Sequence, residues 1–134
     1  MKKDEAAFLE MMLKSISAQV TTEIKAPAMI SMANAKSSVE RSDYGLLVQR
    51  AEEVQRWITY LLLELKTAVE KSIEVEKISR AELFKWDGHL ASLERKLESC
   101  GYLAQRLGDQ KILEGVAKVV NRVRSLRQHI KTWW

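Results

Sequence analysis

The spacing of apolar residues constrains this chain more than any other feature, because they recur in steps of three and four along most of its length. Side chains at that spacing share one face of an α-helix, and strict alternation of the two steps is typical of coiled-coil packing. The alternation is regular at residues 42–77, 79–107 and 109–131. One proline and five glycines leave little material for turns. We therefore predict a single all-α domain spanning residues 1–134.

The N-terminal part predicts one long helix followed by a short one. Apolar residues share one face from Asp4 to Lys25. Pro27 should end this helix, because its ring removes a backbone donor and clashes with the preceding turn. Proline also suits the first position of a helix, so we expect a short helix from Pro27 to Lys36. A polar, serine-rich stretch predicts a connection at residues 37–42.

Two later boundaries carry clear capping signals. Ser79 and Glu82 have the spacing of a capping box, in which each side chain accepts from the other residue's amide. Gly108 can end the next helix in a left-handed conformation, and Asp109 can cap the last one. Such short connections make consecutive helices antiparallel.

The predicted architecture is an up-down antiparallel bundle of about four long helices, with the Pro27 helix as an extra. An elongated antiparallel coiled coil that dimerises is the competing interpretation. The second long helix is the longest, so one end would project and need a partner. We therefore expect a homo-oligomer or a subunit of a larger complex. The predicted core includes Leu61, Leu65, Leu90, Leu93, Val119 and Val123, together with Trp57 and Trp86.

Cys100 is the only cysteine, so it forms no internal disulfide, and we interpret it as a small buried core residue. A lone thiol fits a reducing compartment, and together with the absence of a secretory signal it predicts a cytoplasmic protein. Gly101 lies beside it, next to the apolar stripe. We interpret this pair as a close approach of two helices, with a local kink as the alternative. The longest apolar stretch is too short to span a bilayer, so no integral membrane protein is expected.

No catalytic constellation, metal-ligand set or phosphate-binding loop is present in the sequence, so we predict a non-enzymatic protein without a cofactor or a small-molecule substrate. Arg124 and His129 have the Arg-x4-His spacing that resembles the signature of HEPN-type ribonucleases. The resemblance covers six residues and would imply a helical, dimeric enzyme that cuts RNA. On an uninterrupted helix these two side chains lie about 140° apart, so we assign the chain to no family.

The net charge of +4 is confined to the last predicted helix. Residues 1–108 contain sixteen basic and sixteen acidic side chains, whereas residues 109–134 contain six and two, an excess of four. The cations flank the apolar stripe on both sides. Those with the strongest claim to bind a partner are Lys118, Arg122, Arg124, Arg127 and Lys131, joined by the terminal Trp134.

Three interpretations of this basic helix remain open. The cations could pair with carboxylates of a neighbouring helix, for which the candidates are Glu64, Glu70, Glu74 and Glu76. They could instead bind phosphates, which arginine's planar fork suits. In the third interpretation the helix docks on an acidic protein or a membrane surface.

The leading functional hypothesis is a helical-bundle subunit that binds nucleic-acid phosphates, of DNA or RNA, through its C-terminal helix within a larger nucleoprotein assembly. Trp133 continues the apolar stripe and is expected to plug the end of the bundle, whereas Trp134 would meet the partner. The alternative is a protein–protein interaction adaptor or structural oligomer subunit, whose basic helix packs on acidic partner helices.

Overall fold

The computed structural model describes residues 2–71 and 80–133, and every element in those ranges is helical. This confirms the predicted all-α fold. The elements are α1 (Lys3–Val20), the π turn η1 (Thr21–Lys25), α2 (Ala26–Ala33), α3 (Ser38–Lys71), α4 (Arg80–Leu107) and α5 (Gln110–Lys131).

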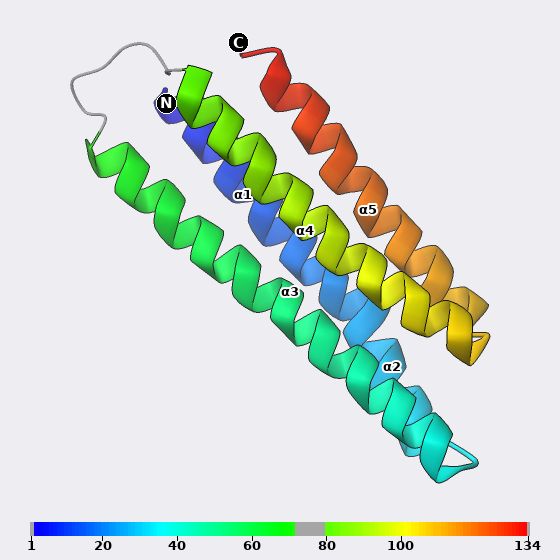
Figure 1. Cartoon of the computed structure of the whole chain (residues 1–134). Coiled ribbons are helices and arrows are strands. Elements are labelled where there is room, and N and C mark those ends of the chain that lie inside the picture. Colours follow the sequence, from blue (N-terminus) through cyan, green and yellow to red (C-terminus); the bar gives the residue numbers. More distant parts are fainter. Residues whose placement is uncertain (1, 72–79, 134) are drawn as a thin grey trace.

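The four long helices form an antiparallel bundle (Figure 1). α4 packs on α3 along one side and on α5 along the other, and α1 lies against both α3 and α5. α2 continues from α1 and packs on the beginning of α3, so this end of the molecule extends past the α4–α5 connection (Figure 1). α2 therefore covers the part of the long α3 that extends beyond α4 and α5.

One core runs through all four long helices. The six aliphatic residues predicted for it are each at most 3% exposed, and burial of a side chain of this kind stabilises the fold by roughly 1.5–3 kcal/mol. Cys100 and Trp86 are buried as predicted. The prediction for Trp57 is confirmed only in part: its side chain is half-buried and packs against the core, but it also lines a surface groove between α3 and α4.

Pro27 does not end the first helix. Backbone dihedrals remain helical from α1 through η1 into α2, with the amide of Ala26 bonded to the carbonyl of Thr21. The wider π turn just before the proline accommodates its ring, which in an α-helix would clash with the preceding turn. Gln55 of α3 donates to the carbonyl of Ser17 at 3.0 Å, which ties α3 to the last turn of α1 just before the π turn.

The connection between α2 and α3 lies at residues 34–37, earlier than predicted. The Ser37 hydroxyl accepts from the amide of Glu40 at 3.1 Å, and the Glu40 carboxylate accepts from the amide of Lys36 at 3.3 Å. These bonds cap the start of α3. The Ser-x-x-Glu spacing that identifies this cap is visible in the sequence and was missed there. Ser79, of the other predicted capping box, lies outside the described residues.

The close helix approach predicted at Gly101 is found at Gly115 instead. A methyl group on Gly101 would meet Val116 at 3.5 Å, an ordinary contact, and α4 runs through this position without interruption. A methyl group on Gly115 would lie 2.6 Å from the carbonyl oxygen of Glu23 in η1. Gly115 therefore allows α5 to pack against the π turn.

The tight turn between α4 and α5 follows the sequence prediction. Gly108 adopts a left-handed conformation, with φ at +68°, and Asp109 accepts from the amide of Ile112 at 3.1 Å. Tyr44 of α3 donates its hydroxyl to Asp109 at 2.8 Å. Burial and this acceptor raise the pKa of Tyr44. The hydrogen bond ties the α4–α5 turn to α3.

Candidate functional site

The two arginines at the centre of the predicted site point toward α4. Arg127 donates to Asp87 at 2.9 Å and to Glu94 at 2.8 Å, while Arg124 pairs with Glu94 and, at 3.3 Å, with Glu98. We call these five side chains the α4–α5 seam. Two cations against three carboxylates leave it with a net charge of −1.

Glu94 is the centre of the α4–α5 seam. It is 8% exposed, and it is the one buried charged residue in the described part of the chain. Burial alone would raise the pKa of Glu94, but hydrogen bonds and charge from Arg124 and Arg127 outweigh it, so the pKa is lowered. The carboxylate is therefore ionised at neutral pH, and both arginines form ion pairs with it. This matches the interpretation that the cations pair within the bundle, although the partners belong to α4 and not to the predicted α3 set.

The other predicted site residues are dispersed. Arg122 is half-buried and donates to Ser15 and Gln19 of α1, at 2.9 and 3.0 Å. Lys118 and Lys131 are exposed and form no ion pair with a described residue. Trp134 lies outside the described residues. The structure therefore does not gather the five described residues of the predicted site into one surface.

Two further sequence predictions concern the end of α5. Trp133 is half-buried and packs edge-on against Phe8 and His129, as expected of an end-plug. Arg124 and His129 do not face each other: Arg124 points to α4, whereas His129 packs on Phe8 of α1. The spacing that resembles the ribonuclease signature thus forms no paired site within this chain.

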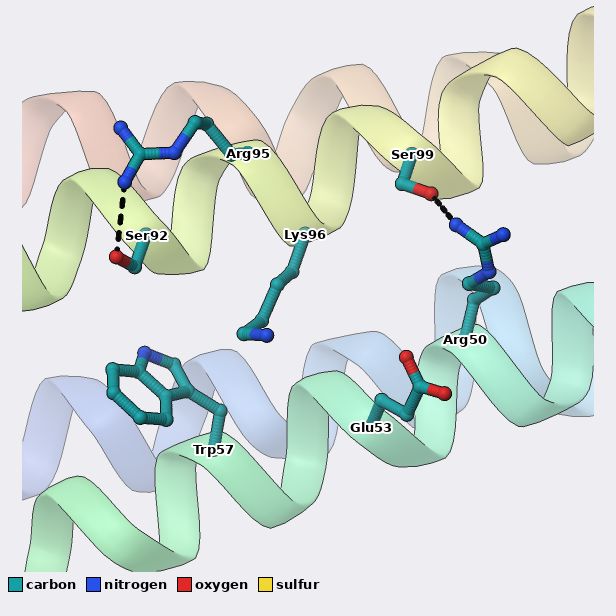
Figure 2. A pocket seen from close by; sticks show the side chains of 7 residues that line it. All are labelled: Arg50, Glu53, Trp57, Ser92, Arg95, Lys96 and Ser99. Atoms are coloured by element: carbon teal, nitrogen blue, oxygen red, sulfur yellow. Dashed lines mark hydrogen bonds between the residues drawn. The ribbon is translucent and has the colours of Figure 1, made fainter.

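A second group of basic side chains lies on the opposite face of α4, in a groove of about 410 Å³ shared with α3 (Figure 2). We call it the α3–α4 groove. It is lined by Arg50, Glu53, Trp57, Ser92, Arg95, Lys96 and Ser99. Three cations and one carboxylate give it a net charge of +2, and none of the three cations forms an ion pair with a described residue.

Neutral partners hold these three cations in place (Figure 2). Arg50 of α3 donates across the groove to the hydroxyl of Ser99 on α4. Arg95 donates to Ser92 at 3.1 Å, and the Lys96 ammonium lies 5.6 Å from the centroid of the Trp57 ring. A hydroxyl or an aromatic face orients a cation without cancelling its charge. The groove therefore presents positioned positive charge that an anionic ligand can still use.

An aromatic cluster adjoins one end of the α3–α4 groove. Tyr60 stacks on Trp57 with centroids 5.1 Å apart, and His89 of α4 contacts both rings edge-on. The Trp57 indole donates to the carbonyl of His89 at 3.2 Å. Burial, reinforced by the charge of Lys85, lowers the pKa of His89, so the imidazole is neutral at pH 7 and adds no charge. The cluster supplies flat apolar surface next to the cations.

A third feature is an apolar groove of about 690 Å³ between α1 and α3. We call it the α1–α3 groove. Its floor and walls include Ala6, Leu62 and Leu65, and Leu63 on its wall is 61% exposed. Lys3, Glu10, Lys66 and Glu70 also line it.

The α3–α4 groove was missed from the sequence because α3 and α4 are nearly balanced in charge along the chain. Helical geometry separates those charges in space: Asp87, Glu94 and Glu98 face α5, whereas Arg95 and Lys96 line the groove shared with α3. A helical wheel of the segment from 80 to 107 would have shown two faces of opposite sign.

Comparisons with known proteins and searches for metal sites and membrane spans complete the description of the site. Comparison of the chain with protein-family models, curated proteins and solved structures finds no match. Within residues 2–71 and 80–133, no group of three or more His, Cys, Asp or Glu side chains is placed to hold a metal ion. No helix of the described part combines the length and apolar character needed to cross a membrane.

Proposed function

We propose that this protein is a non-enzymatic helical-bundle module that binds the phosphates of nucleic acid, as part of a larger nucleoprotein assembly. The contact surface is the α3–α4 groove, in place of the C-terminal helix that the sequence favoured. The observation that supports this proposal is the set of three cations in one groove, each held by a hydroxyl or an aromatic ring.

Phosphate suits this arrangement for two reasons. Arginine's planar fork donates two parallel bonds to a phosphate, and Arg50 and Arg95 are both already oriented by serine hydroxyls. Cations that have no carboxylate partner also release the most counterions when a polyanion binds. Glu53 opposes binding, since its carboxylate lies among the cations. The groove contacts only phosphates by this mechanism, so binding should be tolerant of sequence and steeply dependent on salt.

The test is a titration of fluorescently labelled 20-nucleotide DNA and RNA, single- and double-stranded, at about 50 and 200 mM salt. The groove variant carries Arg50→Gln, Arg95→Gln and Lys96→Gln. A matched control removes three exposed α5 cations through Lys111→Gln, Lys118→Gln and Lys131→Gln. Removal of one cation that binds a phosphate reduces the salt slope by about 0.7–0.9. We therefore expect the slope to fall by two or more units in the groove variant and by less than one in the control.

Three results would contradict the proposal. Absence of binding at low salt would remove nucleic acid as the partner. Unchanged binding by the groove variant, together with weaker binding by the α5 control, would return the site to the C-terminal helix. Equal weakening in both variants would indicate that net charge matters and the groove does not. Thermal unfolding of each variant, followed by circular dichroism, checks that it is folded.

The α1–α3 groove supports a second candidate function, a protein-interaction adaptor or structural oligomer subunit. An apolar groove with Leu63 exposed on its wall is suited to accept an amphipathic helix. Sedimentation of the wild type and of Leu63→Glu across a wide concentration range tests the oligomer form of this idea. A monomer throughout would contradict it.

A further inference from the structure

From the geometry of the α3–α4 groove we infer that its ligand is a single-stranded nucleic acid, with one base stacked on Tyr60. This inference rests on the proposed function and narrows it. It combines two adjacent features: the cations of the groove, which form no ion pair with a described residue, and the aromatic cluster at its end. Proteins that bind single strands pair a positively charged groove with aromatic side chains on which bases stack.

A duplex can use only half of this surface. Its bases are stacked on each other and paired, so it offers phosphates to the cations but no free base to the aromatic cluster. A single strand offers both its phosphates and its base faces. The exposed ring beside the cations therefore favours the single strand by the free energy of one base–aromatic stack.

Tyr60 is the ring that a base can reach. The Trp57 indole is already occupied: it stacks on Tyr60, donates to His89 and lies close to Lys96. Tyr60 is 44% exposed, and its hydroxyl donates to Glu64 at 2.8 Å, which fixes the ring. A base that stacks on Tyr60 would extend the existing pair with Trp57. The ring is held in advance, so little side-chain entropy is lost on binding.

The dimensions fit a short segment of strand. Arg50 and Tyr60 are ten residues apart on α3, which corresponds to about 15 Å along the helix. At about 3.4 Å per nucleotide of a stacked strand, this length accommodates roughly four nucleotides. Phosphates would lie along Arg50, Arg95 and Lys96, and the base at the far end would meet Tyr60.

The experiment compares a labelled 20-nucleotide oligothymidine with a 20-base-pair duplex in the same low-salt buffer. Tyr60→Leu removes the ring, and Tyr60→Phe keeps the ring while removing the hydroxyl. Tyr102→Leu is the matched control, because Tyr102 is 76% exposed on α4 but lines a different groove, against α5. All four proteins are first shown by circular dichroism to be equally helical.

We expect the wild type to bind the single strand at least five-fold more tightly than the duplex. Tyr60→Leu should weaken single-strand binding by between about 5-fold and 100-fold, the effect of losing one base–aromatic stack. It should leave duplex binding and the salt slope unchanged. Tyr60→Phe keeps the ring but loses the bond to Glu64, so it should bind slightly more weakly than the wild type and much more tightly than Tyr60→Leu. Tyr102→Leu should bind like the wild type.

Equal affinity for single strand and duplex, or full single-strand affinity in Tyr60→Leu, would overturn this inference. If the groove variant with three Gln substitutions still bound more weakly than the wild type in that case, the proposed function would be retained without the single-strand inference. If neither oligonucleotide bound the wild type, the proposed function would fall and the inference with it. The two failures are therefore distinguishable.

Discussion

The α4–α5 seam and the α3–α4 groove lie on two faces of the same helix and hold basic side chains in opposite ways. In the seam, two arginines share three carboxylates around the buried Glu94. In the groove, three cations are oriented by two serines and one indole. A carboxylate partner neutralises a cation, whereas a hydroxyl or an aromatic ring only positions it. The comparison shows that the partner of each cation decides whether its charge is available to a ligand. The number of cations in a segment is therefore a poor measure of available charge.

The largest expected effect comes from removing the centre of the seam. Glu94→Ala leaves Arg124 and Arg127 without their buried partner. Breaking a fully buried pair costs about 3–5 kcal/mol, and these arginines are partly exposed, so we expect a decrease of about 2–3 kcal/mol in the free energy of unfolding. Urea denaturation followed by circular dichroism measures it. The matched change in the groove, Glu53→Ala, should cost less than about 0.5 kcal/mol. Equal decreases in the two variants would remove the distinction between the two faces.

A smaller difference is expected for single cations of the two regions. Arg127→Gln removes two ion pairs from the seam and should destabilise the protein by about 1–2 kcal/mol. Arg95→Gln removes an exposed cation whose partner is a serine, and its effect should stay within about 0.5 kcal/mol. Denaturant midpoints of the two variants, compared with the wild type, test this pair. A larger decrease for Arg95→Gln would show that the groove cations are structural.

The α4–α5 seam also predicts how the free energy of unfolding depends on pH in the acidic range. Its arginines hold the pKa of Glu94 below the ordinary value of 4.5. The resulting stabilisation is present above the unfolded-state pKa and is lost as pH falls through the lowered pKa of the folded state. Between pH 5 and pH 3 the wild type should therefore lose more unfolding free energy than Glu94→Gln. Parallel slopes for the two proteins would contradict this assignment.

The smallest effect should be a gain of affinity in the groove. Glu53→Gln removes the one carboxylate among the three cations and should tighten binding of the oligothymidine about 2- to 4-fold at low salt. The gain should fade as salt rises, since the charges are screened. Fluorescence anisotropy at two salt concentrations is sufficient to detect it. Weaker binding by Glu53→Gln would mean that the carboxylate contacts the ligand or orders the cations.

The helices could be predicted because their apolar spacing is a local signal. The cap of α5 at Asp109 and the left-handed Gly108 follow from residue type alone. The path through Pro27 could not be predicted in the same way, because the proline rule assumes an unbroken α-helix, whereas this chain widens to a π turn just before the ring. Gly115 was missed because the need for a small residue arises from η1, nearly a hundred residues away in the sequence.

The candidate site was less predictable than the fold. Counting charge along the chain identified α5 as basic, which is correct, but it could not show that Arg124 and Arg127 are neutralised by α4. It also hid Arg95, because Glu94 and Glu98, close to it in the sequence, pair with α5. Arg50 was hidden in part by Glu52, which pairs with Lys25 of η1. Pairing between helices is a tertiary property. The positions of the helices could therefore be predicted from the sequence, whereas the cations without an ion-pair partner among the described residues could not.

The π turn η1 determines where the chain can change in length. Val20, Ile24 and Ala28 are all fully buried, although they follow one another in steps of four that would turn an α-helical stripe by about 40° each. A π turn contains one surplus residue and restores the phase. Deleting one residue from Thr21–Lys25, together with Pro27→Ala, would convert the spacing to the strict alternation of four and three seen in the other helices. A deletion in the middle of another helix would instead rotate everything beyond it by about 100° and move the apolar face out of the core.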